Sequence, residues 1–260
     1  AKNAIQQMAD LPAPRVTPSR PFTHTGVDYA GPFTIRSMTP RSTKTSKGYI
    51  ALFICFAVKA IHLEVVSDMT TPTFIAALHR FISRRGQPSV MYSDCGSNLK
   101  GADNELRQLL NLAHEEISSE LSKKGIKWQF NPPAAPHFGG LWEAGVKSFK
   151  YHFYRVVGNT ILNFEEMTTL AAQIEACLNS RPLTPMNSED LDSLEVLTPG
   201  HFLVGSALTA PPEPDLTHLK LNRLSRWQLV QSLKQNLWRR WSSDYLNTLQ
   251  QRYKWQEVHP

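Results

Sequence analysis

The sequence predicts an α/β domain in which a mixed β-sheet is covered by helices and followed by a C-terminal helical extension. Segments rich in β-branched and aromatic residues follow one another in the order three strands, helix, strand, helix, strand. In the best-defined helical segment apolar residues recur at helical spacing, and the helical pattern returns over the last 40 residues. Together these observations favour a sheet with helices packed against it.

The first three predicted strands follow one another without a helix between them. An apolar strand surrounds Val27 and is followed by Gly31-Pro32 and a basic loop rich in Ser and Thr. The run YIALFICFAV at 49–58 is suited to a buried strand, and AIHLEVVS at 60–67 is its predicted partner. This part of the chain is therefore expected to form a meander.

Helices and strands alternate after the meander. The segment from Thr70 to Arg85 has apolar residues at 74, 75, 78, 81 and 82 and stops at Gly86, which predicts a helix. Short strands are predicted at 89–94 and 126–131, and a helix that runs to about 124 is predicted between them. A second helix is predicted from about 141 and a third over 164–179.

Four regions are expected along the chain. Residues 1–21 are rich in Pro and Arg and predict an extended linker, and residues 22–180 contain the predicted sheet and its helices. Residues 181–222 are Pro-rich and are expected to be irregular, whereas residues 223–260 predict a basic, Trp-rich helical extension.

Composition narrows the class of protein. The net charge of +6 and the isoelectric point near 9.3 favour a polyanionic partner. No apolar run approaches the roughly 18 to 20 residues of a membrane span, and the first residues lack a secretion signal. Cys55, Cys95 and Cys177 are odd in number and far apart, which disfavours a disulfide framework or zinc site and fits a reducing compartment.

Three carboxylates are candidates for the catalytic and metal-binding residues. Asp28 lies inside an apolar strand, Asp94 ends another, and Glu143 stands just inside a helix. Singly, Asp94 suits a turn and Glu143 a helix N-terminus, but an apolar strand is a costly place for the charge of Asp28. Converging at one sheet edge, these oxygen ligands suit two Mg²⁺ or Mn²⁺ ions, which assist in-line phosphoryl displacement.

Three ordered motifs around these carboxylates carry a resemblance to a known family. THTGVDYAGPF, YSDCGSNLKGA and PHFGGLWEAGVKSFK resemble the DDE core of retroviral-type integrases. The run KAIHLEVVSDMTTPTFIAALHRFISRRGQPSVMYSDCGSN is similar to the Bel/Pao group of LTR retrotransposons, as are LTPGHFLVG and WRRWSSDYLNTLQQRYKW further on. The likeness covers nearly the whole chain, and the 48 residues between Asp94 and Glu143 resemble this group's long spacing.

The resemblance implies a ribonuclease-H-like, five-stranded core that processes the 3′ ends of retroelement DNA and joins them to target DNA. Asp28, Asp94 and Glu143 would then hold two Mg²⁺ or Mn²⁺ ions. Double-stranded DNA, both element ends and target, would be the partner of a homo-oligomer in the nucleus, after a cytoplasmic virus-like-particle stage. A zinc domain would precede this region and a small β-barrel would follow it. Cys95 and Ser97 depart from the family's usual Asn and Thr without removing a ligand.

Several residues near the carboxylates are candidate DNA contacts. Lys147 and Lys150 stand four and seven residues after Glu143 on its helical face, where DNA phosphates would lie. His137 belongs to the loop before Glu143, and Asn98 resembles a position near the active site in relatives. The alternative interpretations are solvated surface lysines and a packing role for the loop.

The C-terminal extension interleaves basic residues with tryptophans. Arg239 and Arg240 are predicted to bind DNA together with the other basic residues of this region. Trp227, Leu233, Leu237 and Trp241 instead predict an apolar stripe that packs against the core or a sister subunit.

Two other functions stay open at the level of the sequence. The same fold serves transposases and ribonuclease H enzymes, which differ in chemistry from an integrase. A domesticated or inactive integrase could also act as a non-catalytic DNA-binding or scaffold protein, although the three intact carboxylates favour an enzyme.

Overall fold

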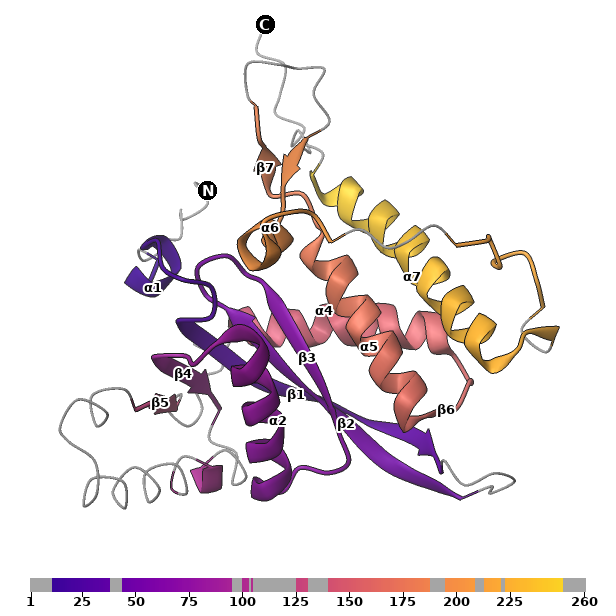
Figure 1. The fold of residues 1–260 in the computed structure, drawn as a ribbon, viewed down its shortest axis with the longest axis horizontal. Coiled ribbons are helices and arrows are strands. Elements are labelled where there is room, and N and C mark those ends of the chain that lie inside the picture. Colours follow the sequence, from indigo (N-terminus) through magenta and orange to yellow (C-terminus); the bar gives the residue numbers. More distant parts are fainter. Residues whose placement is uncertain are drawn as a thin grey trace, which may run out of the picture.

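The computed structural model describes residues 11–37, 44–94, 100–102, 104, 125–130, 140–187, 195–208, 213–220 and 223–249. Its sheet has the strand order β3-β2-β1-β4-β5, with β6 pairing to the far end of β1 (Figure 1). The strands are β1 (His24–Arg36), β2 (Thr45–Cys55), β3 (Ile61–Val66), β4 (Val90–Ser93), β5 (Lys127–Phe130) and β6 (Leu162–Asn163). The principal helices are α2 (Thr71–Arg85), α4 (Gly140–Val157), α5 (Phe164–Asn179) and α7 (Arg226–Leu249).

The sheet is mixed, as predicted. β1, β2 and β3 form an antiparallel meander, whereas β4 pairs in parallel with β1 and β5 in parallel with β4. This five-stranded order with flanking helices confirms the expected ribonuclease-H-like fold. One difference concerns β1, which continues past Gly31-Pro32 to Arg36 with a register irregularity between Ala30 and Phe33. A bulge of this kind lets a strand pass residues that would otherwise end it.

The two faces of the sheet bury different helices. Because side chains alternate along a strand, Ile50, Leu52 and Ile54 share one face of β2 and pack in a cluster with α4, α5 and α7. Ala51, Phe53 and Cys55 point to the opposite face and pack with α2, β4 and β5. The sheet therefore has α4, α5 and α7 on one face and α2 on the other (Figure 1).

Local sequence signals define the two helices that were predicted most closely. α2 ends at Gly86, whose φ of 84° is unfavourable for other residues and whose N–H donates to the Ile82 carbonyl. α5 begins with a capping box, in which the side chain of Asn163 accepts from the Glu166 N–H and the side chain of Glu166 accepts from the Asn163 N–H. Both helices occupy the predicted ranges within one residue.

The C-terminal helix is part of the main core. Leu233, Leu237 and Trp241 of α7 are buried in the same cluster as α4 and α5, as the predicted apolar stripe requires. Trp227, the fourth predicted member of the stripe, is instead 56% exposed in the first turn of the helix. Figure 1 shows α7 running alongside α5, so the helix is packed against the domain throughout this region.

Short elements also occur in the regions that were expected to be extended or irregular. A single helical turn, α1 (Ala13–Val16), lies in the predicted linker. The predicted Pro-rich connection contains the paired strands β7 (Thr184–Pro185) and β8 (Val196–Leu197) and the short helix α6 (Pro199–Val204). These elements are too short to leave a periodic signal in the sequence.

A network of charged side chains lies between β3, α2 and α5, and its central members His62, Glu64 and Glu175 are buried. Glu64 and Glu175 both accept from the imidazole of His62, at 3.1 Å and 3.2 Å. Glu64 also pairs with Arg80 and Arg84 of α2, and Glu175 pairs with Arg85. Burial alone would lower the pKa of His62, but its hydrogen bonds to Glu175 and Glu64 outweigh burial and raise that pKa.

The same helix α5 covers the outer edge of β3. Asn179 accepts from the Ile61 N–H and donates to the Ile61 carbonyl, both at 2.8 Å. One turn earlier Glu175 accepts from the Leu63 N–H at 2.8 Å. These bonds satisfy backbone groups that an open sheet edge would leave unpaired. Asn179 and Glu175 therefore stabilise the end of the sheet as well as the helix packing.

Two further findings concern the cysteines and the possibility of a membrane span. Cys55 and Cys177 are buried free thiols, and burial raises the pKa of Cys177 to about 11. Cys95 lies outside the described residues. Among the helices that the structure describes, none is both long and apolar enough to cross a membrane.

Candidate active site

The pleat of β1 places the Asp28 side chain on the face of the sheet that α4 covers. It lies directly opposite Leu52 of β2, whose side chain belongs to the core beneath α4. The Asp28 side chain is only partly exposed, and its Oδ1 accepts from the Tyr29 N–H at 2.7 Å. The carboxylate therefore sits in the middle of a strand on the face that α4 covers.

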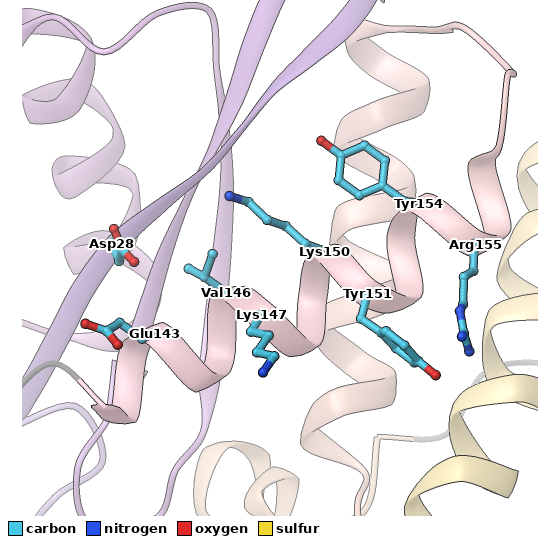
Figure 2. Close-up of a pocket in the computed structure, with 8 residues that line it drawn as sticks. All are labelled: Asp28, Glu143, Val146, Lys147, Lys150, Tyr151, Tyr154 and Arg155. Atoms are coloured by element: carbon cyan, nitrogen blue, oxygen red, sulfur yellow. The ribbon is translucent and has the colours of Figure 1, made fainter. Parts of the chain in front are cut away.

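Glu143 reaches this region because α4 packs closely against β1. Trp142, the preceding residue, is 1% exposed and presses on Gly26, where an added Cβ would lie 2.6 Å from the Trp142 ring. Gly145 allows a similar approach to Leu52, because a Cβ added at Gly145 would lie 3.3 Å from the Leu52 side chain. With Trp142 facing inward, Glu143 is exposed at the start of the helix, next to Asp28 (Figure 2).

Asp94 approaches the same place from β4. Ser93, the last residue of β4, pairs in parallel with Val27, so Asp94 leaves the sheet beside Asp28. Asp94 is exposed. The three predicted carboxylates are thus delivered by β1, the end of β4 and the start of α4. Asn98 and His137, also predicted to belong to the site, lie outside the described residues.

The carboxylates act on one another electrostatically. Burial makes the largest contribution to raising the pKa of Asp28 above its usual range. The negative charges of Asp94 and Glu143 raise it further, while the Tyr29 N–H and the Lys150 ammonium oppose the shift. In the described residues neither Asp28 nor Glu143 forms an ion pair. In the part of the chain that the structure describes, the Asp28 carboxylate is thus close to two like charges and to one opposing cation, Lys150.

A cleft of about 660 Å³ begins at Asp28 and Glu143 and follows the exposed side of α4. Lys147 and Lys150 line it, as their spacing from Glu143 predicted (Figure 2). Tyr151, Tyr154 and Arg155 also line it and were not predicted. Their signal in the sequence is the same helical spacing, since residues four apart share a helix face. The cleft therefore extends well beyond the acidic end.

The donor set suits a hard divalent cation. Carboxylate oxygens are the ligands that Mg²⁺ and Mn²⁺ prefer, and a cation would offset both the burial and the repulsion that raise the pKa of Asp28. Within the described parts of the chain, no three acidic, His or Cys side chains are close enough to enclose a metal ion. Asp28 and Glu143 thus share one end of the cleft, with Asp94 following the neighbouring end of β4, and the three do not form a closed ligand set.

Arg239 and Arg240 lie on α7, outside this cleft. Arg239 donates to the Thr217 hydroxyl at 2.7 Å and lies 3.7 Å from Asp215, while Arg240 donates to the Arg155 carbonyl at 3.3 Å. Both side chains remain exposed. Two other basic residues of α7, Arg226 and Lys234, pair with carboxylates of the chain itself. The basic residues of this helix are therefore partly engaged within the protein.

Comparison with known proteins gives one family match and several structural likenesses. Residues 225–260 match a family of unknown function, DUF5641, and no curated protein matches the chain. The chain is similar to one in the cryo-EM structure of the simian T-cell lymphotropic virus intasome in complex with PP2A regulatory subunit B56 gamma. That likeness has 14% identity and a TM-score of 0.49, and covers 81% of this chain but only 65% of the other.

A second likeness is to the HTLV-2 integrase catalytic core domain in complex with magnesium, in its trimeric form. It has 15% identity and a TM-score of 0.43, and covers 70% of this chain and 97% of that one. The ribonuclease-H-like class of this domain is defined by its strand order and by the helices on its two faces.

Proposed function

We propose that this protein is an integrase of a Bel/Pao-type LTR retrotransposon, which processes the 3′ ends of the element's DNA and joins them to target DNA. The observation that carries the proposal is the charge of Asp28. A partly buried carboxylate lies in mid-strand, repelled by Asp94 and Glu143, at the end of a cleft that Lys147 and Lys150 also line. This arrangement suits chemistry on a phosphodiester.

In this proposal Asp28, Asp94 and Glu143 hold two Mg²⁺ or Mn²⁺ ions. When bound, such ions activate the attacking oxygen and stabilise the leaving oxygen of an in-line displacement. Lys147 and Lys150 bind phosphates near the reacting one, because both follow Glu143 along α4 and line the same cleft. The opposite face of α4 is buried in the core, and this packing fixes the positions of Glu143 and both lysines relative to the sheet.

The remaining assignments follow from the same proposal. The partner is double-stranded DNA, with Asn98, His137, Arg239 and Arg240 as further contacts. Two DNA ends joined in concert require a homo-oligomer, and the reaction takes place in the nucleus. The net charge of +6 supports a polyanionic partner.

A strand-transfer assay with duplex oligonucleotides of the element's end sequence, in Mn²⁺, tests the proposal. We expect the wild-type chain to nick and join DNA and Glu143→Gln to abolish both reactions while retaining duplex binding. Glu165→Gln removes an exposed carboxylate in the first turn of another helix, α5, and should leave activity unchanged. Turnover by Glu143→Gln would overturn the site assignment. Duplex binding by a wild-type chain that neither nicks nor joins DNA would favour the non-catalytic alternative.

A further inference from the structure

The cleft continues along α4 for three turns beyond Glu143, and its far part is aromatic. In Figure 2 Lys150 and Tyr154 project to one side of the helix, and Lys147, Tyr151 and Arg155 project to the other. Each of these rows repeats every four residues, which keeps it on one face of a helix. The carboxylates at one end are therefore followed by lysines and then by tyrosines and an arginine.

The two tyrosine rings are exposed but held in place. Tyr151 is 45% exposed and Tyr154 is 51% exposed. The guanidinium Cζ of Arg155 lies 3.8 Å from the centroid of the Tyr151 ring. The Tyr154 ring packs against the buried ring of Phe33, with 5.6 Å between centroids. Rings fixed on one side and open on another are suited to stacking on a flat ligand.

We propose that Tyr151 and Tyr154 stack on unpaired bases of a single-stranded segment continuous with the DNA end held at Asp28 and Glu143. Lys150 and Arg155 bind the phosphates of that segment. The inference rests on the proposed function and adds to it that the protein recognises unpaired bases next to the DNA end. Proteins that bind single-stranded nucleic acid without sequence preference use exposed aromatic rings interleaved with cations, since every base has a face that can stack.

Helix geometry sets the length of the segment. At a rise of about 1.5 Å per residue, Tyr151 and Tyr154 lie roughly 12 Å and 16 Å along the axis from Glu143. At about 3.4 Å per stacked nucleotide this corresponds to roughly three to five nucleotides. An extension of one nucleotide should therefore not reach the rings, whereas one of five nucleotides should.

A second, smaller cleft lies where the proposed single-stranded DNA segment would continue beyond the tyrosines. It has a volume of about 210 Å³, lies between α4 and α7, and shares Arg155 with the first cleft. Arg240 and Asn236 of α7 line it as well. A strand that passes the tyrosines therefore meets further polar and cationic groups on α7, which gives Arg240 a position along the same path.

Fluorescence anisotropy of the 260-residue chain in metal-free buffer tests this inference. The probes are a blunt duplex, the duplex with a five-nucleotide DNA extension, and the same extension made abasic. We expect the base-bearing extension to bind about tenfold more tightly than the abasic one, the effect of stacking on one or two bases. The double variant Tyr151→Ser, Tyr154→Ser should lose this preference, and Tyr151→Phe, Tyr154→Phe should retain it.

Phe202→Ser supplies the matched control, because it removes an exposed ring, 44% accessible, from α6. It should leave the preference unchanged. Equal binding of the two extensions by the wild type, or an unchanged preference in the Ser double variant, would overturn the inference. Tighter binding of an RNA extension than of the DNA extension would also overturn it.

This test uses no catalysis, so its failure is distinguishable from failure of the proposed function. A chain that joins DNA but ignores the bases of the extension retains the proposed function and refutes the stacking site. A chain that prefers base-bearing extensions but joins no DNA supports the stacking site and refutes the enzyme.

Discussion

Two groups of carboxylates in this fold have opposite electrostatic surroundings. Glu64 of β3 and Glu175 of α5 are faced by His62 and by three arginines of α2. Asp28 is instead faced by Asp94 and Glu143, and the Lys150 ammonium opposes the rise in its pKa. Hydrogen bonds from His62 and Arg80 outweigh burial and lower the pKa of Glu64, whereas burial and like charges raise that of Asp28.

The difference separates a structural role from a functional one. Glu64 and Glu175 have their charge neutralised by the chain itself, so they join α2 and α5 to the sheet. Among the described residues no cation forms an ion pair with Asp28 or Glu143, and an unpaired, partly buried charge such as that of Asp28 costs stability unless it is balanced. Perturbed carboxylates of this kind cluster at functional sites. The comparison can be sharpened by removing charge from each group in turn.

The largest effect is expected from Glu175→Ala. The variant leaves Arg85 without its carboxylate, leaves His62 with Glu64 alone, and removes the acceptor of the Leu63 N–H, so the free energy of unfolding should fall by about 3–5 kcal/mol. Urea denaturation measures the loss. Glu165→Ala, an exposed position on the same helix, should change stability by no more than about 0.5 kcal/mol. Equal losses in the two variants would show that the network contributes nothing of its own.

A smaller effect of opposite sign is expected from Asp28→Asn in metal-free buffer. Because its folded-state pKa is raised, the Asp28 carboxyl binds its proton more tightly when folded, and stability falls as pH rises through that pKa. At neutral pH the Asn variant avoids this loss. We expect its melting temperature to rise by about 2–4 °C, the shift that about 1 kcal/mol produces. A lower melting temperature would mean that the charge of Asp28 stabilises the fold.

The smallest effect is a pH dependence of stability from His62. Its pKa is raised in the folded state, so its stabilisation is complete below about pH 6.5 and is lost as pH rises through the folded value. The facing groups are Glu64 of β3, Glu175 of α5 and Arg85 of α2. Melting curves from pH 6 to pH 9 should show a decline of a few degrees that His62→Asn flattens. An identical decline in the variant would assign it to other groups.

Most of the fold could be predicted from the sequence because its signals are local. The apolar spacing of α2 with Gly86 at its end, and the capping box of α5, each define a helix without reference to the rest of the chain. The extension of β1 beyond Gly31-Pro32 and the two-residue strand β6 could not be predicted, since each depends on pairing with a distant segment.

The site was predictable in part for the same reason. Asp28 was conspicuous as a charge inside an apolar strand, and helical spacing placed Lys147 and Lys150 beside Glu143. The pairing of Glu175 with Arg85 joins residues far apart in the chain and left no pattern to recognise. The exposure of Trp227 was missed because periodicity does not show where along α7 the packing begins.

The most direct test of the central claim is the melting temperature of the wild type and of Asp28→Asn with and without Mn²⁺. A ligand that binds only the folded state stabilises it in proportion to the logarithm of its concentration above the Kd. We expect Mn²⁺ to raise the melting temperature of the wild type by several degrees and to leave that of Asp28→Asn unchanged, so that the variant's metal-free advantage disappears. Equal shifts in both proteins, or none in the wild type, would contradict a divalent-cation site at Asp28.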